Sequence, residues 1–297
     1  MKPKDSPVII IAAARSGTKL LRAVLANSPE FIDFPYDMNY IWKYGNYHIP
    51  HDELAKEDIT EETRRFIKDQ FNKLLNKSNA KRVLEKSVPN SLRVDFVKSI
   101  FPECKMIHLY RDGRDVAVDS RQCWQSSMLS GNIQSKTDLF NKIIHFPIVA
   151  AWPYLLNYGL TYSKRLLKKE KQVESWGPRF EGIDEASERF SLLEVCGMQW
   201  AKSIEHCLSS FSRLEENVDY INVRYETLVR DPLTVLKTIC DYLEISLNDS
   251  MAHFAKSQIT DRYIGYWKEN STHPEMRSLM PHIEKCQKAI SCSTESA

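Results

Sequence analysis

The sequence predicts an α/β fold in which helices cover a mostly parallel sheet. Short apolar runs, of the kind that form strands buried on both faces, are followed by a turn and then by apolar residues at helical spacing. This strand-and-helix unit occurs three times along the chain. Strands that alternate with helices are typical of an α/β fold with a parallel sheet.

The first unit lies near the N-terminus. The continuous apolar run Val8–Ala14 predicts a central buried strand, because it is too short for an export signal and leads straight into a glycine turn. Residues 16–18 break the run. Apolar residues then recur at helical spacing from Leu20 to Leu25, and Pro29 ends the pattern.

The second unit lies between residues 82 and 115. Arg82–Leu84 is short and β-prone, and residues 92–100 show one apolar helical face. Lys105–Tyr110 predicts the next strand, in which His108 is expected to be a packed core residue. We expect a helix to begin near Asp115.

The third unit begins with the predicted strand Tyr220–Arg224. Asp231 has the character of an N-cap, and Pro232 suits the first position of a helix. Apolar residues at 233–243 are spaced as on the buried face of that helix.

Composition limits the classes of function. The 297 residues suffice for one large domain or two small ones, and no repeat or low-complexity linker divides them, so we expect one domain over residues 1–297. The net charge of +2 gives no overall field for nucleic acid. No apolar run approaches the roughly 20 residues of a membrane span.

Cysteine and histidine spacing argues against a structural metal site. The seven cysteines form no CxxC pair, which predicts neither zinc site nor disulfide framework and suggests a reducing, cytoplasmic setting. His48 and His51 are three residues apart, but no third ligand of suitable spacing follows. We therefore expect no metal.

Two segments are candidate anion-binding sites. Arg15–Lys19 (RSGTK) follows the first strand and opens a helix, whose N-terminus offers free N–H groups to phosphate, although it lacks the Walker A pattern. Arg111–Val118 (RDGRDVAV) follows a later strand with two arginines, the residue best suited to bidentate phosphate binding. An ordinary capped turn and a surface loop are the respective alternatives.

Together these segments resemble the sulfotransferase family that uses 3′-phosphoadenosine 5′-phosphosulfate, in its bacterial-type and tyrosylprotein-sulfotransferase-like branch. The family's motifs are matched in order by RSGTKLL at 15–21, EKSVPN at 85–90, RDGRDVA at 111–117, YETL at 225–228 followed by Asp231-Pro232, and GYWK at 265–268. The resemblance implies a P-loop-kinase-like parallel sheet flanked by helices, with residues 125–190 as a mainly helical insertion on the acceptor side.

The resemblance also implies a role for individual residues. Arg15 would contact the 5′-phosphosulfate and stabilise the transferring group, and Lys86 would reach the sulfuryl or bridging oxygen. Arg111 would hold the 3′-phosphate, and Tyr225 would lie near the adenine. The remaining donor-binding residues would be Ser16, Gly17, Thr18 and Lys19 around the 5′-phosphate, and Arg262, Gly265 and Lys268 over the 3′-phosphate.

The chain departs from the family pattern at two positions. Lys19 stands where threonine is more usual, and lysine still suits an anion. The family usually has serine eight residues after the 3′-phosphate arginine, where this chain has Asp119 followed by Ser120. An aspartate beside phosphate is unfavourable, so Asp119 and Ser120 are alternative occupants of that position.

Two carboxylates are candidates for the base that accepts the proton of the acceptor hydroxyl. Asp37 lies 22 residues after Arg15, close to the offset of the catalytic glutamate in protein-tyrosine members of the family. Glu85 adjoins Lys86 at a strand end. We favour Asp37 as the base, with Glu85 orienting Lys86.

The sequence therefore predicts an enzyme that transfers a sulfuryl group to an acceptor hydroxyl. A glycan is the first expectation for the acceptor, ahead of a peptidyl tyrosine or a small alcohol. A P-loop-like nucleotide kinase and a non-catalytic nucleotide-binding scaffold are the alternative functions. The missing Walker A loop argues against the kinase.

Overall fold

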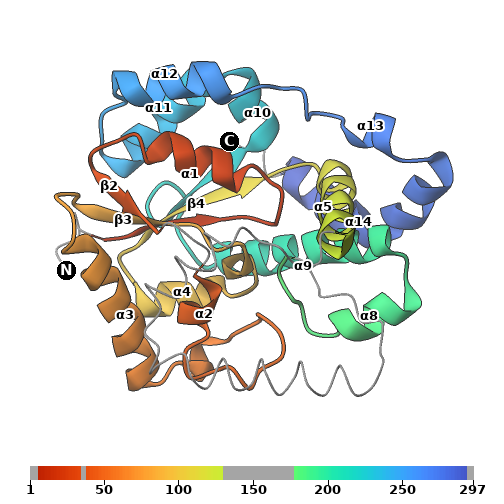
Figure 1. Ribbon diagram of the computed structural model, residues 1–297, viewed down its shortest axis with the longest axis horizontal. Helices are drawn as coiled ribbons and strands as arrows, with labels where there is room; N and C mark the ends of the chain where they lie inside the picture. The colour runs from red at the N-terminus through yellow and green to blue at the C-terminus, as the bar shows by residue number, and fades with distance from the viewer. Residues whose placement is uncertain (1–5, 35–37, 130–176, 293–297) are drawn as a thin grey trace.

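The computed structural model describes residues 6–34, 38–129 and 177–292. Its centre is a five-stranded sheet whose neighbouring strands are all parallel. In spatial order the strands are β2 (Phe31–Asp33), β3 (Arg82–Glu85), β1 (Val8–Ile11), β4 (Lys105–Tyr110) and β5 (Tyr220–Arg224). The predicted α/β fold with a parallel sheet flanked by helices is confirmed (Figure 1).

The central strand is β1, as its unbroken apolar run predicts. Val8 pairs with Leu84 of β3 on one side and with Lys105 of β4 on the other. All four residues of β1 are buried, because the sheet is covered on both faces.

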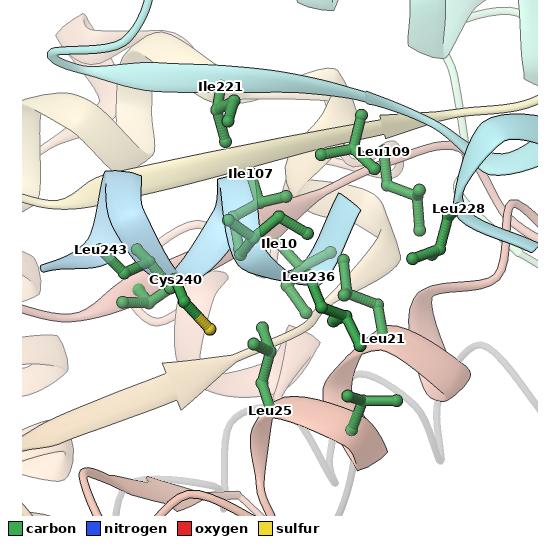
Figure 2. Close-up of a cluster of buried hydrophobic side chains, with 14 of the residues drawn as sticks. Ile10, Leu21, Leu25, Ile107, Leu109, Ile221, Leu228, Leu236, Cys240 and Leu243 are labelled. Atoms are coloured by element: carbon green, nitrogen blue, oxygen red, sulfur yellow. The ribbon is translucent and has the colours of Figure 1, made fainter. Parts of the chain in front are cut away.

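One face of the sheet is covered by helices from the first and the third of the predicted units and by one helix that follows them (Figure 1). They are α1 (Thr18–Leu25), α10 (Tyr225–Arg230), α11 (Pro232–Leu243) and α12 (Asp249–Gln258). Figure 2 shows Leu21 and Leu25 of α1 and Leu236 and Cys240 of α11 meeting over Ile10 in one apolar cluster. The Asp231 cap is confirmed, since its side chain accepts a hydrogen bond from the Thr234 N–H.

The opposite face is covered by a second group of helices. It contains α2 (Asn39–Trp42), α3 (Glu61–Leu75), α4 (Val94–Ile100) and α9 (Leu192–Phe211), with the short 3-10 helices η2 (Lys56–Asp58) and η3 (Val88–Leu92) beside them. Trp42 and Phe71 make an edge-on ring contact at 5.7 Å within the apolar cluster of this face.

A third apolar cluster lies beyond the end of the sheet, where α5 (Gly113–Leu129) packs against α9 and α14 (His273–Cys292). The short helices α8 (Ile183–Arg189) and α13 (Trp267–Asn270) complete the described elements. Trp124 belongs to this cluster and is 2% exposed, so it is a core residue. Of the expected insertion at 125–190, residues 130–176 lie outside the described part of the chain.

Two local features differ from the expectation from sequence. The first strand ends at Ile11 rather than at Ala14, because the chain leaves the sheet to enter the turn before α1, although Ala14 is still buried. The three-residue strand β2 at Phe31–Asp33 was not predicted. It is too short to show a periodic pattern.

None of the helices in the described ranges is long and apolar enough to cross a membrane.

His108 is expected to make the stability of the protein fall as the pH is lowered. It is buried in β4, with Nδ1 2.8 Å from Asn222 Oδ1, and burial lowers the pKa of His108 to about 4 from 6.5. In the unfolded chain His108 therefore binds a proton near pH 6.5, whereas in the folded chain it binds one only near pH 4. Between pH 7 and pH 5 this linkage removes about 2 kcal/mol of unfolding free energy.

Urea unfolding of wild type and His108→Asn at both pH values measures this contribution. The wild type should lose about 2 kcal/mol more than the variant on going to pH 5. Equal losses would contradict a neutral, buried His108.

Candidate functional site

The predicted site segments gather at one edge of the sheet. Arg15 follows β1, Lys86 follows β3, Arg111 follows β4 and Tyr225 follows β5, so each comes directly after the carboxyl end of a parallel strand or within a few residues of it. The chain also passes over β1 on its way from β3 to β4. Ligands of open α/β sheets bind at such a switch in strand order.

The turn between β1 and α1 brings its backbone close to Tyr225. Arg15 has a φ of 62° and Gly17, the N-cap of α1, has a φ of 90°. A Cβ atom on Gly17 would lie 2.7 Å from Tyr225 Cδ2, so only glycine fits there. Thr18 is buried and Lys19 is exposed. The turn thus places the N-terminus of α1 beside an aromatic ring.

Ser16 carries an unsatisfied hydroxyl at the centre of this turn. Its side chain is 0% exposed, and Oγ has no hydrogen-bond partner among the described residues. A buried polar atom without a partner is costly, and native proteins keep such atoms mainly where a ligand or water completes them. The turn is therefore suited to a group that supplies an acceptor oxygen.

Arg111 joins the β1–α1 turn to the C-terminal part of the chain. It is 2% exposed, and it donates from Nη1 to the Arg15 carbonyl at 2.8 Å and from Nη2 to the Tyr263 carbonyl at 2.7 Å. Its guanidinium lies 4.7 Å from the centre of the Tyr225 ring. The indole N–H of Trp200 donates to the Arg111 carbonyl at 3.1 Å, which fixes the end of β4 against α9.

Asp119 lies between the two arginines of the site. One oxygen accepts from Arg15 Nε at 3.0 Å and Nη2 at 2.9 Å, and the other accepts from Arg111 Nη1 at 3.3 Å. Burial alone would lower the pKa of Arg15, but the Asp119 carboxylate outweighs this and raises it, so Arg15 is charged. Ser120, the next residue, is buried. Asp119 is thus the side chain of this pair that contacts Arg111.

Glu85 is held by a chain of polar side chains. It is 1% exposed and accepts from Asn90 Nδ2 at 2.9 Å, while Asn90 Oδ1 accepts from Arg93 Nε at 2.9 Å. Arg93 Nη2 then donates to Asn39 Oδ1 at 2.7 Å. Lys86, the next residue to Glu85, is half-buried. The carboxyl end of β3 is therefore fixed to the segment around residue 39.

Asp37 lies outside the described residues. Its neighbour Met38 donates its N–H to Ser87 Oγ at 3.2 Å, which places the described end of that segment beside the Glu85–Lys86 turn.

The C-terminal motif is anchored to the start of α5. Asp115 accepts from the N–H of Gly265 at 2.9 Å and of Trp267 at 3.0 Å, and burial raises the pKa of Asp115. Gly265 has a φ of 72°. Lys268 and Arg262 are exposed. The turn that carries them thus lies against the same helix end as Arg111.

Sequence reasoning named Asp119 only as an alternative occupant of the 3′-phosphate position, and it gave Asp115 no role in the site. Asp115 and Asp119 are one helical turn apart, and both face Arg111, at 3.9 Å and 3.3 Å. The i, i+4 and i, i+8 spacing from Arg111 was visible in the sequence. The pairing of Asp119 with Arg15 was not, because 104 residues separate the two.

These residues fit a bound nucleotide phosphate. Two guanidinium groups, an unsatisfied hydroxyl and the N-terminus of α1 surround the same turn. Such a set stabilises negative charge by hydrogen bonds and dipoles that are already oriented.

Comparison with known proteins gives a consistent result. The profile of a sulfotransferase domain family matches residues 5–289. Among solved structures, the chain resembles the sulfotransferase domain of the olefin synthase of Synechococcus PCC 7002, with 16% identity, a TM-score of 0.56, and 96% of this chain and 94% of that one covered. It also resembles the sulfotransferase domain of the curacin biosynthetic pathway, with 16% identity, a TM-score of 0.53, and coverage of 93% and 96%.

A third solved structure, the sulfotransferase STF9 of Mycobacterium avium, has 11% identity and a TM-score of 0.53 over 96% of this chain and 76% of that one. A search of curated protein sequences finds no significant match. The structural likeness confirms the P-loop-kinase-like fold expected from the sequence.

Proposed function

Because the chain belongs to the sulfotransferase domain family, we propose that it transfers a sulfuryl group from 3′-phosphoadenosine 5′-phosphosulfate to an acceptor hydroxyl. One observation carries the proposal of this donor. Arg111 donates to the Arg15 carbonyl at 2.8 Å and so joins the two arginines beside the unsatisfied Ser16 hydroxyl. Their positive charge suits a donor with negative charge at two separate positions.

We assign the donor-binding residues by their place around this pair. The 5′-phosphosulfate is bound by Arg15, Ser16, Gly17, Thr18 and Lys19. Arg111 binds the 3′-phosphate with Asp119 or Ser120 at its side, and Tyr225 lies near the adenine. Arg262, Gly265 and Lys268 close over the 3′-phosphate. The anchoring of Gly265 by Asp115 supports that last assignment, since it brings the turn to the helix end beside Arg111.

The chemistry needs charge stabilisation and one proton acceptor. Arg15 and Lys86 stabilise the negative charge that gathers on the bridging oxygen as its bond to sulfur breaks. A carboxylate accepts the proton of the acceptor hydroxyl as the new oxygen–sulfur bond forms. We assign this role to Asp37 and give Glu85 the role of orienting Lys86. The hydrogen bond from Asn90 to the buried Glu85 supports an orienting role.

For the acceptor, we propose a glycan hydroxyl. The support is the mixture of aromatic and polar side chains in the segments 36–60 and 125–190. A peptidyl tyrosine and a small alcohol are the alternatives.

We also propose a cytoplasmic setting, which the free thiols of six described cysteines support.

Calorimetric titration with 3′-phosphoadenosine 5′-phosphate, the expected product, tests the donor assignment. We expect wild type to bind this nucleotide more tightly than ATP with Mg²⁺. Preference for ATP would favour a kinase. Failure to bind either nucleotide would contradict the proposed donor.

Ser16→Ala is expected to weaken nucleotide binding by about tenfold without destabilising the free protein. The hydroxyl has no partner to lose among the described residues, but a donor phosphate would bond to it. Ser91→Ala is the matched control, because Ser91 is equally buried and donates to the Val88 carbonyl at 2.9 Å.

The control should show the opposite pattern, with a stability loss of about 1 kcal/mol and unchanged binding. Urea unfolding and calorimetry on both variants measure the two effects. A destabilised Ser16→Ala protein with normal affinity would show that this hydroxyl has a structural role only.

A further inference from the structure

Asp119 occupies the position from which an anion would contact both arginines. Its two oxygens divide between them, one at 2.9 Å from Arg15 Nη2 and the other at 3.3 Å from Arg111 Nη1. Asp115 adds a second carboxylate 3.9 Å from Arg111. Two guanidinium groups therefore face two carboxylates, and the formal charge of the cluster is zero.

The hydrogen bonds of the two arginines also support the view that Asp119 occupies the position of an anion. Arg15 directs both Nε and Nη2 at a single oxygen of Asp119. Arg111 directs its two terminal nitrogens at the Arg15 and Tyr263 carbonyls, with Nη1 shared with Asp119. The edge of the Arg15 guanidinium that would bind a phosphate in bidentate fashion is thus already used by a side chain.

We propose that Asp119 is an internal competitor of the donor, and that displacement of its carboxylate from Arg15 limits the affinity for the nucleotide. This inference rests on the proposed function. In the free protein Asp119 compensates two charges that would otherwise be held close together, one of them buried. When the nucleotide binds, its 5′- and 3′-phosphates take over this compensation, and the carboxylate moves away from Arg15.

Solvent reaches the pair of Arg15 and Asp119 more than it reaches Arg111. The side chain of Asp119 is 12% exposed and that of Arg15 is 35% exposed, whereas Arg111 is held at 3%. The pair between Arg15 and Asp119 is thus the more open of the two contacts. Cys123 and Tyr263 are the other titratable groups that interact with Arg15. Burial raises the pKa of Cys123, and Arg15 partly offsets this rise.

Asp119→Asn tests the competition, because the amide keeps the shape of the carboxylate and removes its charge. We expect this variant to bind 3′-phosphoadenosine 5′-phosphate about tenfold more tightly than wild type, or better, and inorganic sulfate more tightly as well. Asp219→Asn is the matched control. Asp219 pairs with Lys98 at 2.7 Å just before β5, at the opposite end of that strand from Tyr225, and its variant should bind like wild type.

The two probes separate this inference from the proposed function. If Asp119→Asn binds sulfate more tightly while neither protein binds the nucleotide, the competition stands and the proposed donor is wrong. If the nucleotide binds wild type, and Asp119→Asn binds it equally or more weakly, the competition is overturned and the donor assignment stands. Sulfate affinity that does not rise also overturns it.

A crystal structure of the wild type with the nucleotide decides the matter if Asp119→Asn fails to fold. The distance from Arg15 Nη2 to Asp119 Oδ1, 2.9 Å in the free protein, should exceed the roughly 4 Å limit of an ion pair. An intact pair in the complex would overturn the inference.

Discussion

Replacing Arg111 with alanine should weaken nucleotide binding at least about 100-fold and remove about 3–5 kcal/mol of unfolding free energy. The side chain is almost fully buried and bonds the carbonyls of Arg15 and Tyr263. Without it, Asp115 loses a cation 3.9 Å away and Asp119 loses one 3.3 Å away. The loss of an ion-pair partner leaves an uncompensated charge, which costs more than the pair itself contributes.

Calorimetry measures the loss of nucleotide affinity, and urea unfolding measures the loss of stability. Two further variants test whether these losses are specific to Arg111. Arg111→Lys keeps the charge but cannot reach two carbonyls with a planar fork, so we expect intermediate values. Arg114→Ala removes an arginine of the same motif that is 33% exposed and pairs with Asp112. It should cost about 1 kcal/mol or less. Similar losses for Arg114→Ala and Arg111→Ala would show that Arg111 has no special role.

Gly17→Ala should destabilise the protein by about 2–4 kcal/mol and weaken nucleotide binding strongly. Two costs add in this variant. The φ of 90° is unfavourable for alanine, and the new Cβ would lie 2.7 Å from the Tyr225 ring. The Arg111 guanidinium lies 4.7 Å from the centre of this ring, so a shift of the ring would also disturb that contact.

Gly182→Ala isolates the backbone cost from the steric one. Gly182 is also the N-cap of a helix, with a φ of 85°, but its Cβ would meet only Glu185 Oε2 at 3.9 Å. We expect a loss of about 1 kcal/mol and unchanged nucleotide affinity in this control. If the two alanine variants were equally stable, the contact between Gly17 and Tyr225 would carry no cost.

Local pattern was enough to predict the main strands. Lys105–Tyr110 and Tyr220–Arg224 have the predicted bounds, because each is a short, mainly apolar run with polar residues at its ends. The cap at Asp231 was predictable for a similar reason, since the residues that form it are only three apart.

The parts that escaped prediction depend on long-range contacts or on very short elements. The strand Phe31–Asp33 has only three residues, so β3 rather than its own sequence determines it. The contact of Tyr225 with Gly17 and the pair between Arg15 and Asp119 join segments far apart in the chain. The order of the motifs placed them at one edge of the sheet but could not show which side chains neutralise one another there.

The anchoring of Arg111 has a consequence for the order in which the chain can be completed during synthesis. The site needs Arg15 from the turn after β1, the Tyr263 carbonyl, and Gln287, whose side chain accepts the Gly113 N–H at 2.9 Å. A nascent chain that has not yet been synthesised as far as residue 287 therefore lacks part of the support for Arg111. Contacts of such long sequence separation form slowly, so we expect bound nucleotide to favour docking of the C-terminal segment that carries Tyr263 and Gln287.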